Sequence, residues 1–140
     1  MTQACFDTST TTTERVASAL EGAASPAAQH VFTQLYADAA RAGAQHCDAQ
    51  AQAGRSSAAL HGVCITIKDN IDVAGETTMA GGMVCAGEAP ALHDAPVLQR
   101  LRDAGAVVLG KTNMSEFAFS GVGINPHHGT PTNPADPAHA

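Results

Sequence analysis

The chain has 140 residues, of which 44% are hydrophobic and 14% are charged, and its formal net charge is −6. This composition can bury a core, which excludes a disordered tail, and the length suits one domain. The seven Lys and Arg residues are scattered along the chain, so they form no basic stripe that could grip a phosphate backbone. The sequence therefore predicts a folded protein that does not bind nucleic acid.

The N-terminus and the cysteines indicate the compartment. Residues 1–10 contain neither a basic start nor an apolar run, which excludes a secretory signal, and every apolar run is too short to cross a bilayer. The four cysteines lack C-x-x-C spacing, which favours free thiols over disulfides or a zinc site. We expect a cytoplasmic protein with no membrane partner.

The first predicted helix follows a polar N-terminal end. Residues 1–11 are expected to be flexible. Thr11 and Glu14 have the spacing of a capping box, which predicts a helix that begins directly after Thr11. Val16 and Leu20 would lie on its buried face.

A second helix is predicted from Pro26, because Ser25 and Pro26 form a start signal. Apolar residues at i,i+4 spacing then favour an amphipathic helix over 26–43 that resumes over 45–53. Residues 12–55 are therefore expected to form a helical N-terminal segment.

Residues 56–140 are expected to begin an α/β core. The predicted elements are a strand over 63–69, a loop over 70–95, a helix over 94–104, a strand over 106–110 and a helix over 113–120. Val97, Leu98 and Leu101 would share one face of the first helix, Gly105 would be its C-terminal cap, and Asn113 would cap the start of the second. Both strands are continuous apolar runs, which is typical of parallel strands covered on both faces. No third strand is predicted, and two strands do not make such a sheet. The core is therefore expected to be incomplete.

Lys68 is the first candidate for chemistry, because it directly follows an apolar strand. Catalytic groups collect at the C-terminal ends of parallel strands. Burial would lower the pKa of the ammonium, and the neutral amine could then act as a general base. The structural alternative is a lysine that extends into water or pairs with Asp69 or Asp72. The residues alone favour this alternative.

Two other patterns are interpreted as structural. The segment 105–112 fits the phosphate-binding pattern G-x-x-x-x-G-K-[ST], but a helix precedes it and its middle is a predicted strand whose N–H groups join the sheet. We therefore reject a nucleotide site. The loop histidines have no ligand partner at helical spacing, which favours solvated side chains over metal ligands; they are His93, His127, His128 and His139.

A series of short motifs between residues 60 and 137 resembles the amidase-signature family. The match is specific because many motifs recur in the family's order. They are Leu60–Val63, Ile65–Asn70, Gly75, Thr77–Thr78, Gly81–Gly82, Asp94–Leu98, Leu101–Val107, Gly110–Met114, Glu116–Phe117, Gly129–Thr130 and Asn133–Pro134.

The resemblance implies the first βαβ part of the family's mixed, largely parallel sheet, and an amide hydrolase without a metal or organic cofactor. Lys68 matches the lysine of the family's K-D-N motif, which serves a serine in a cis peptide and a nucleophilic serine. Cys64 stands where the family usually has proline. In the family, a Gly/Ser-rich segment that carries the bridging serine follows the Asn-Pro motif. This segment and both serines are therefore expected beyond Ala140. Ser115 and Ser120 are not expected to replace them, because they fall inside a predicted helix.

The sequence therefore predicts an N-terminal piece of an amidase that acts on a small-molecule carboxamide and is inactive alone. A partner chain, or a missing C-terminal portion of the same protein, would complete it. The alternatives are a non-catalytic truncated product, a partner-dependent subunit piece, or the glutamine-hydrolysing subunit of a transfer-RNA amidotransferase.

Overall fold

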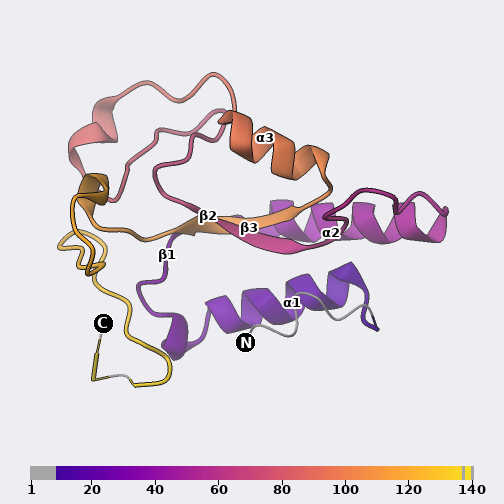
Figure 1. Cartoon of the computed structure of the whole chain (residues 1–140), viewed down its shortest axis with the longest axis horizontal. Coiled ribbons are helices and arrows are strands. Elements are labelled where there is room, and N and C mark those ends of the chain that lie inside the picture. Colours follow the sequence, from indigo (N-terminus) through magenta and orange to yellow (C-terminus); the bar gives the residue numbers. More distant parts are fainter. Residues whose placement is uncertain (1–8, 137, 140) are drawn as a thin grey trace.

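The computed structural model describes residues 9–136, 138 and 139, so most of the predicted flexible end lies outside the described residues. In the described part, helices cover both faces of a three-stranded sheet (Figure 1). With η for a 3-10 helix, the elements are α1 (Thr12–Ala23), η2 (Pro26–Ala28), β1 (Phe32–Leu35), α2 (Ala37–Gln52), β2 (Cys64–Lys68), η3 (Val84–Gly87), α3 (Pro96–Asp103), β3 (Val107–Thr112) and η4 (Glu116–Ala118).

The capping box at the start of α1 is confirmed. Thr11 accepts a hydrogen bond from the backbone N–H of Glu14, and the Glu14 side chain accepts one from the backbone N–H of Thr11. Val16 and Leu20 are buried, as predicted. The Thr11 side chain thus satisfies one of the N–H groups that the first turn of the helix leaves free.

The helix predicted over 26–43 is wrong in its first half. Residues 26–28 form only one 3-10 turn, Phe32–Leu35 form strand β1, and α2 begins at Ala37. The aromatic and β-branched residues of this stretch favour a strand, and β1 has a partner in β3. The prediction that there is no third strand is wrong for the same reason.

The sheet has the order β1-β3-β2. The predicted parallel pair is confirmed, since β2 runs parallel to β3 and α3 lies in the connection between them, while β1 is antiparallel to β3. The pairing of β2 with β3 shifts register, because Ile65 lies opposite Val108 but Ile67 lies opposite Lys111. β3 therefore contains one extra residue, a β-bulge, just before the C-terminal ends of the two strands.

Each face of the sheet has its own hydrophobic core. Helices α1 and α2 pack on one face against Cys64, Val107 and Leu109. The other face carries Ile67 and Val108, which pack with Leu98 of α3 and with Val73. Figure 1 shows α3 and α1 on opposite sides of the strands. Coverage on both faces explains the continuous apolar sequence of β2 and β3 and confirms the α/β fold class.

The C-terminal end of α3 is as predicted, whereas its predicted buried face is only partly so. Gly105 has φ +89 directly after the helix, as a C-terminal glycine cap requires. Leu98 is buried, but Val97 is exposed. No helix in the described part is long and apolar enough to span a membrane.

The helix predicted over 113–120 is wrong. It is reduced to the 3-10 turn η4, in which Phe117 and Ala118 have positive φ. Asn113 does not cap a helix; its side-chain amide donates to the carbonyls of His30 and Gly129. These tertiary hydrogen bonds outweigh the local helix signal.

Candidate active site

The C-terminal ends of β2 and β3 place Lys68 at an open edge of the sheet. Lys68 is the last residue of β2 and lies opposite Thr112, the last residue of β3. Asp69 continues the ladder by donating its N–H to the carbonyl of Thr112 at 3.1 Å. Strand-end position, the first part of the argument for Lys68, is therefore present.

Burial, the second part of that argument, is absent in the described residues. The Lys68 side chain is exposed, so nothing in this part of the chain removes its amine from water. The described residues therefore do not desolvate Lys68.

The two nearby aspartates accept hydrogen bonds from other groups. Asp69 is buried, and its carboxylate accepts hydrogen bonds from the Thr33 hydroxyl at 3.0 Å and the Gly81 N–H at 2.8 Å. Asp72 accepts one from the Thr78 hydroxyl at 2.5 Å. Among the described residues, no ion pair joins Lys68 to either of these carboxylates.

Asp69 closes a loop beside Lys68. The loop leaves the sheet at Asp69 and returns at Ala80 and Gly81, whose N–H groups bond to the Asp69 carbonyl and carboxylate. Gly81 has φ +72, and a Cβ there would lie 2.6 Å from the Met114 carbonyl oxygen. Only glycine fits this contact between the loop and the segment after β3.

Asn125 holds the same region from the other side. It is buried, and its side-chain amide donates to the carbonyls of Gly81 and Met114, both at 2.7 Å. Its side-chain oxygen accepts from the N–H groups of His127 and His128. The loop at Gly81 and the segments around Met114 and Asn125 therefore form one bonded unit at the edge where Lys68 lies.

The two serines after β3 differ in their exposure to solvent. Ser115 is buried, and its hydroxyl has no hydrogen-bond partner within the described chain, while Ser120 is exposed. Both serines were expected not to act as the catalytic serines because they would lie inside a helix. That helix is not formed, so this reason is wrong. Ser115 precedes η4 and Ser120 follows it.

A buried charge network that the sequence reasoning missed lies next to β3. Lys111 exposes only 2% of its side chain, and its ammonium lies 3.6 Å from Glu76 Oε2. The Tyr36 hydroxyl donates to the same oxygen at 2.6 Å. Burial and the hydrogen bond to Glu76 raise the pKa of the Tyr36 phenol, which therefore keeps its proton. The sequence did contain a signal for this network: Lys111 directly follows an apolar run predicted to be a buried strand, and a buried lysine needs a carboxylate partner.

The pattern that imitates a phosphate-binding loop is confirmed as a strand. Residues 107–112 all belong to β3 and are paired with neighbouring strands, so their N–H groups are not free to cradle phosphate. The candidate metal ligands do not gather: among described residues, no group of three or more His, Cys, Asp and Glu side chains could hold a metal ion. The described cysteines, Cys47, Cys64 and Cys85, are not joined in disulfides, and Cys5 lies outside the described residues.

Comparisons with known proteins point to one family. The family model Amidase matches residues 14–140. The chain is 41% identical over 115 residues to an indoleacetamide hydrolase from Bradyrhizobium diazoefficiens, covering 82% of this chain and 22% of that protein. It is 40% identical over 109 residues to a glutamyl-tRNA(Gln) amidotransferase subunit from Acidothermus cellulolyticus, covering 78% of this chain and 21% of that protein.

A solved structure agrees with the sequence relatives. It is the structure of a vestigial protein complex that reveals the origins of an s-triazine catabolic enzyme, with TM-score 0.86, 34% identity, and coverage of 92% of this chain and 28% of that one. The chain thus spans about a quarter of the proteins it matches. The family match, the ordered motifs and the shared fold together show that the chain belongs to the amidase-signature family.

Proposed function

We propose that this chain supplies the general base of an amidase, and that Lys68 is that base. The observation that carries the proposal is the position of the Lys68 amine at the C-terminal end of β2, where it is exposed in the described part of the chain and open to be covered by the rest of the site. Chain that covers this amine would remove it from water, and burial of that kind favours the neutral amine that a general base needs.

In the proposed reaction, the neutral Lys68 amine takes a proton from a bridging serine, which takes the proton of a nucleophilic serine. The nucleophile's oxygen attacks the carbonyl carbon of a carboxamide, the C–N bond breaks, and the leaving amine departs with a proton. This leaves the acyl group bound to the nucleophilic serine as an ester, which water then hydrolyses to release the acid. Both serines and the backbone N–H groups that stabilise the oxyanion would come from chain beyond residue 140 or from a partner.

The names of the relatives support amides as the substrate class, and they do not select an individual amide. One relative is a hydrolase of indoleacetamide and the other belongs to a glutamyl-tRNA(Gln) amidotransferase, so both names fit chemistry on amides. We propose a small-molecule carboxamide as substrate, and hydrolysis before amidotransfer as the reaction. We also propose a cytoplasmic location, supported by cysteine thiols that are not joined in disulfides.

The test uses the full translation product of the gene, assayed on a panel of primary carboxamides. Lys68→Ala should abolish turnover. Lys68→Arg should abolish it too, because arginine keeps the positive charge but does not give up its proton. Arg55→Ala, at an exposed position, serves as the control and should leave turnover unchanged. Full activity in Lys68→Arg would disprove the role of Lys68 as a base.

Sequencing the gene past codon 140 tests where the serines come from. An in-frame Gly/Ser-rich segment supports the proposal that they belong to the same protein. A stop codon with nothing downstream would overturn it and leave only a partner chain or a non-catalytic product.

One observation favours the partner-dependent alternative. Large apolar side chains are exposed near the open edge of the sheet and on its flanking loops, with Phe119 97%, Leu92 87% and Val84 74% exposed. Apolar surface of this kind is usually covered by other protein. A monomeric 1–140 polypeptide that unfolds cooperatively would count against this alternative.

A further inference from the structure

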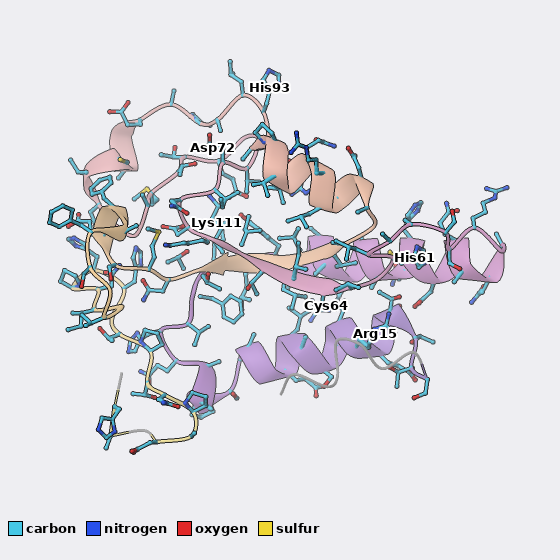
Figure 2. The ribbon with its side chains drawn as sticks, viewed as in Figure 1. Arg15, His61, Cys64, Asp72, His93 and Lys111 are labelled. Carbon is cyan, nitrogen blue, oxygen red and sulfur yellow. The ribbon has the colours of Figure 1, made fainter. Side chains whose placement is uncertain are left out.

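Lys111 is a buried charge that the proposed chemistry does not use. The bulge in β3 determines where it points: residues 108 and 111 of a regular strand would face opposite sides, but the extra residue puts Lys111 opposite Ile67, on the same face as Val108. Figure 2 shows Lys111 on the side of the sheet where the loop with Asp72 lies.

The partners of Lys111 come from two other parts of the chain. Glu76 belongs to the loop after β2, and Tyr36 lies between β1 and α2. Both the Lys111 ammonium, at 3.6 Å, and the Tyr36 hydroxyl, at 2.6 Å, approach the same Glu76 oxygen. One carboxylate oxygen thus joins the loop to the sheet and to the start of a helix.

Glu76 sits in the middle of the loop that begins at Lys68. Close to the strand, the Ile71 N–H bonds to the Lys68 carbonyl at 2.9 Å. At Glu76, its N–H bonds to the Val73 carbonyl and its carbonyl accepts from the Ala91 N–H. The loop returns to Asp69 at Gly81. The only described ion pair between this loop and the sheet is therefore the one between Glu76 and Lys111.

We propose that Lys111, Glu76 and Tyr36 are positioning residues that fix the loop over 69–81, and through it the Lys68 amine, relative to the sheet. This inference rests on the proposed function of Lys68. A base must sit within hydrogen-bond reach of the hydroxyl it deprotonates, and small displacements of such a group reduce turnover steeply. A buried ion pair contributes little net stability but imposes one geometry on the segments it joins.

The test separates positioning from stability with two variants of the full translation product. Glu76→Gln leaves the Lys111 ammonium without a charged partner and should lower both stability and kcat. The triple variant Tyr36→Phe, Glu76→Leu, Lys111→Met removes every polar partner, so it should regain the stability, because an apolar cluster of similar volume can replace a buried pair. Glu88→Gln, at an exposed site directly after η3 and outside the loop over 69–81, is the control and should match the unchanged protein.

Two readouts decide the proposal. The triple variant should keep the kcat loss, about 10-fold to 100-fold, with KM unchanged, although its unfolding transition is restored. Amide hydrogen exchange over 69–81 should remain about ten-fold faster than in the unchanged protein. A triple variant with normal kcat and normal exchange would overturn the proposal. If Lys68→Arg stays active, the proposed function fails and kcat no longer bears on positioning, while the exchange data still show whether the three residues hold the loop.

Discussion

At the scale of single residues, Asp48 links two helices through one carboxylate. It belongs to α2 and accepts hydrogen bonds from the N–H groups of Thr12 and Thr13 at the start of α1, and from the Thr13 hydroxyl. Burial opposes its ionisation, but the hydrogen bonds from Thr13 and Thr12 outweigh burial and hold the Asp48 pKa below its usual value.

This lowered pKa predicts an acid-dependent contribution to stability. Because the folded pKa lies below the unfolded value of about 4, the contribution is complete above that pH and is lost as pH falls through the folded pKa. Asp48→Asn should therefore lower the free energy of unfolding near neutral pH by about 1 kcal/mol, as for loss of a helix cap, and the difference should shrink in acid.

Urea unfolding at several pH values measures the effect of Asp48→Asn. Asp38→Asn is the matched control, since Asp38 lies on the same helix but is exposed, with only a 3.5 Å ion pair to Arg41. A difference between Asp48→Asn and the unchanged chain that stays constant down to strong acid would contradict the prediction.

The two lysines show how far sequence reasoning reaches at this scale. The position of Lys68 at a strand end follows from the apolar run before it, and the structure confirms that position. Its exposure could not be predicted, because burial depends on distant parts of the fold. Lys111 was missed because its direction depends on a bulge in β3, and one extra residue reverses the face to which every later side chain points.

At the scale of elements, Gly110 lies where the backbone of β1 closely approaches β3. A Cβ on Gly110 would overlap the Gln34 carbonyl oxygen and lie 3.1 Å from Leu35 Cα. Gly110→Ala should therefore push β1 away from β3 and destabilise the chain by about 1–3 kcal/mol, as overpacking does. The Tyr36 N–H donates to the Leu109 carbonyl at 2.8 Å, and in the variant this amide hydrogen should exchange with solvent faster.

The control for this prediction is Gly87→Ala, because a Cβ there meets nothing within 4 Å. Its effect on the free energy of unfolding should stay within about 0.5 kcal/mol. Chemical denaturation with hydrogen exchange of the β1 amides compares the two variants. An equal, small effect of both substitutions would show that β1 can move without cost.

Elements that depend on local signals were predictable, and those that depend on distant partners were not. The capping box at Thr11 and the glycine after α3 are local, and both are confirmed. β1 exists because β3 pairs with it, and the segment after Asn113 is not helical because His30 and Gly129 bind the Asn113 side chain. In both cases a tertiary contact overrides the local helix signal.

At the scale of the whole molecule, the proposed function makes the described fold one side of a site. The sheet presents Lys68 at its open edge, and the segments around Gly81, Met114 and Asn125 are bonded into one unit there. The amidase-signature relatives are about four times longer than the stretch that matches this chain. This ratio agrees with the proposal that the serine partners of Lys68 lie outside residues 1–140.

We therefore predict that a polypeptide of residues 1–140 will not hydrolyse carboxamides. Its two candidate hydroxyls do not replace a nucleophile and a bridging serine, because Ser115 is buried and Ser120 is exposed on the other side of η4. An exposed lysine without a bound serine has no hydroxyl to activate, so turnover should equal that of buffer. The assay is ammonia release from primary carboxamides, with the Lys68→Ala polypeptide beside it. Turnover that disappears in Lys68→Ala would show that these residues already hold a complete site, and that one of their own hydroxyls is the nucleophile.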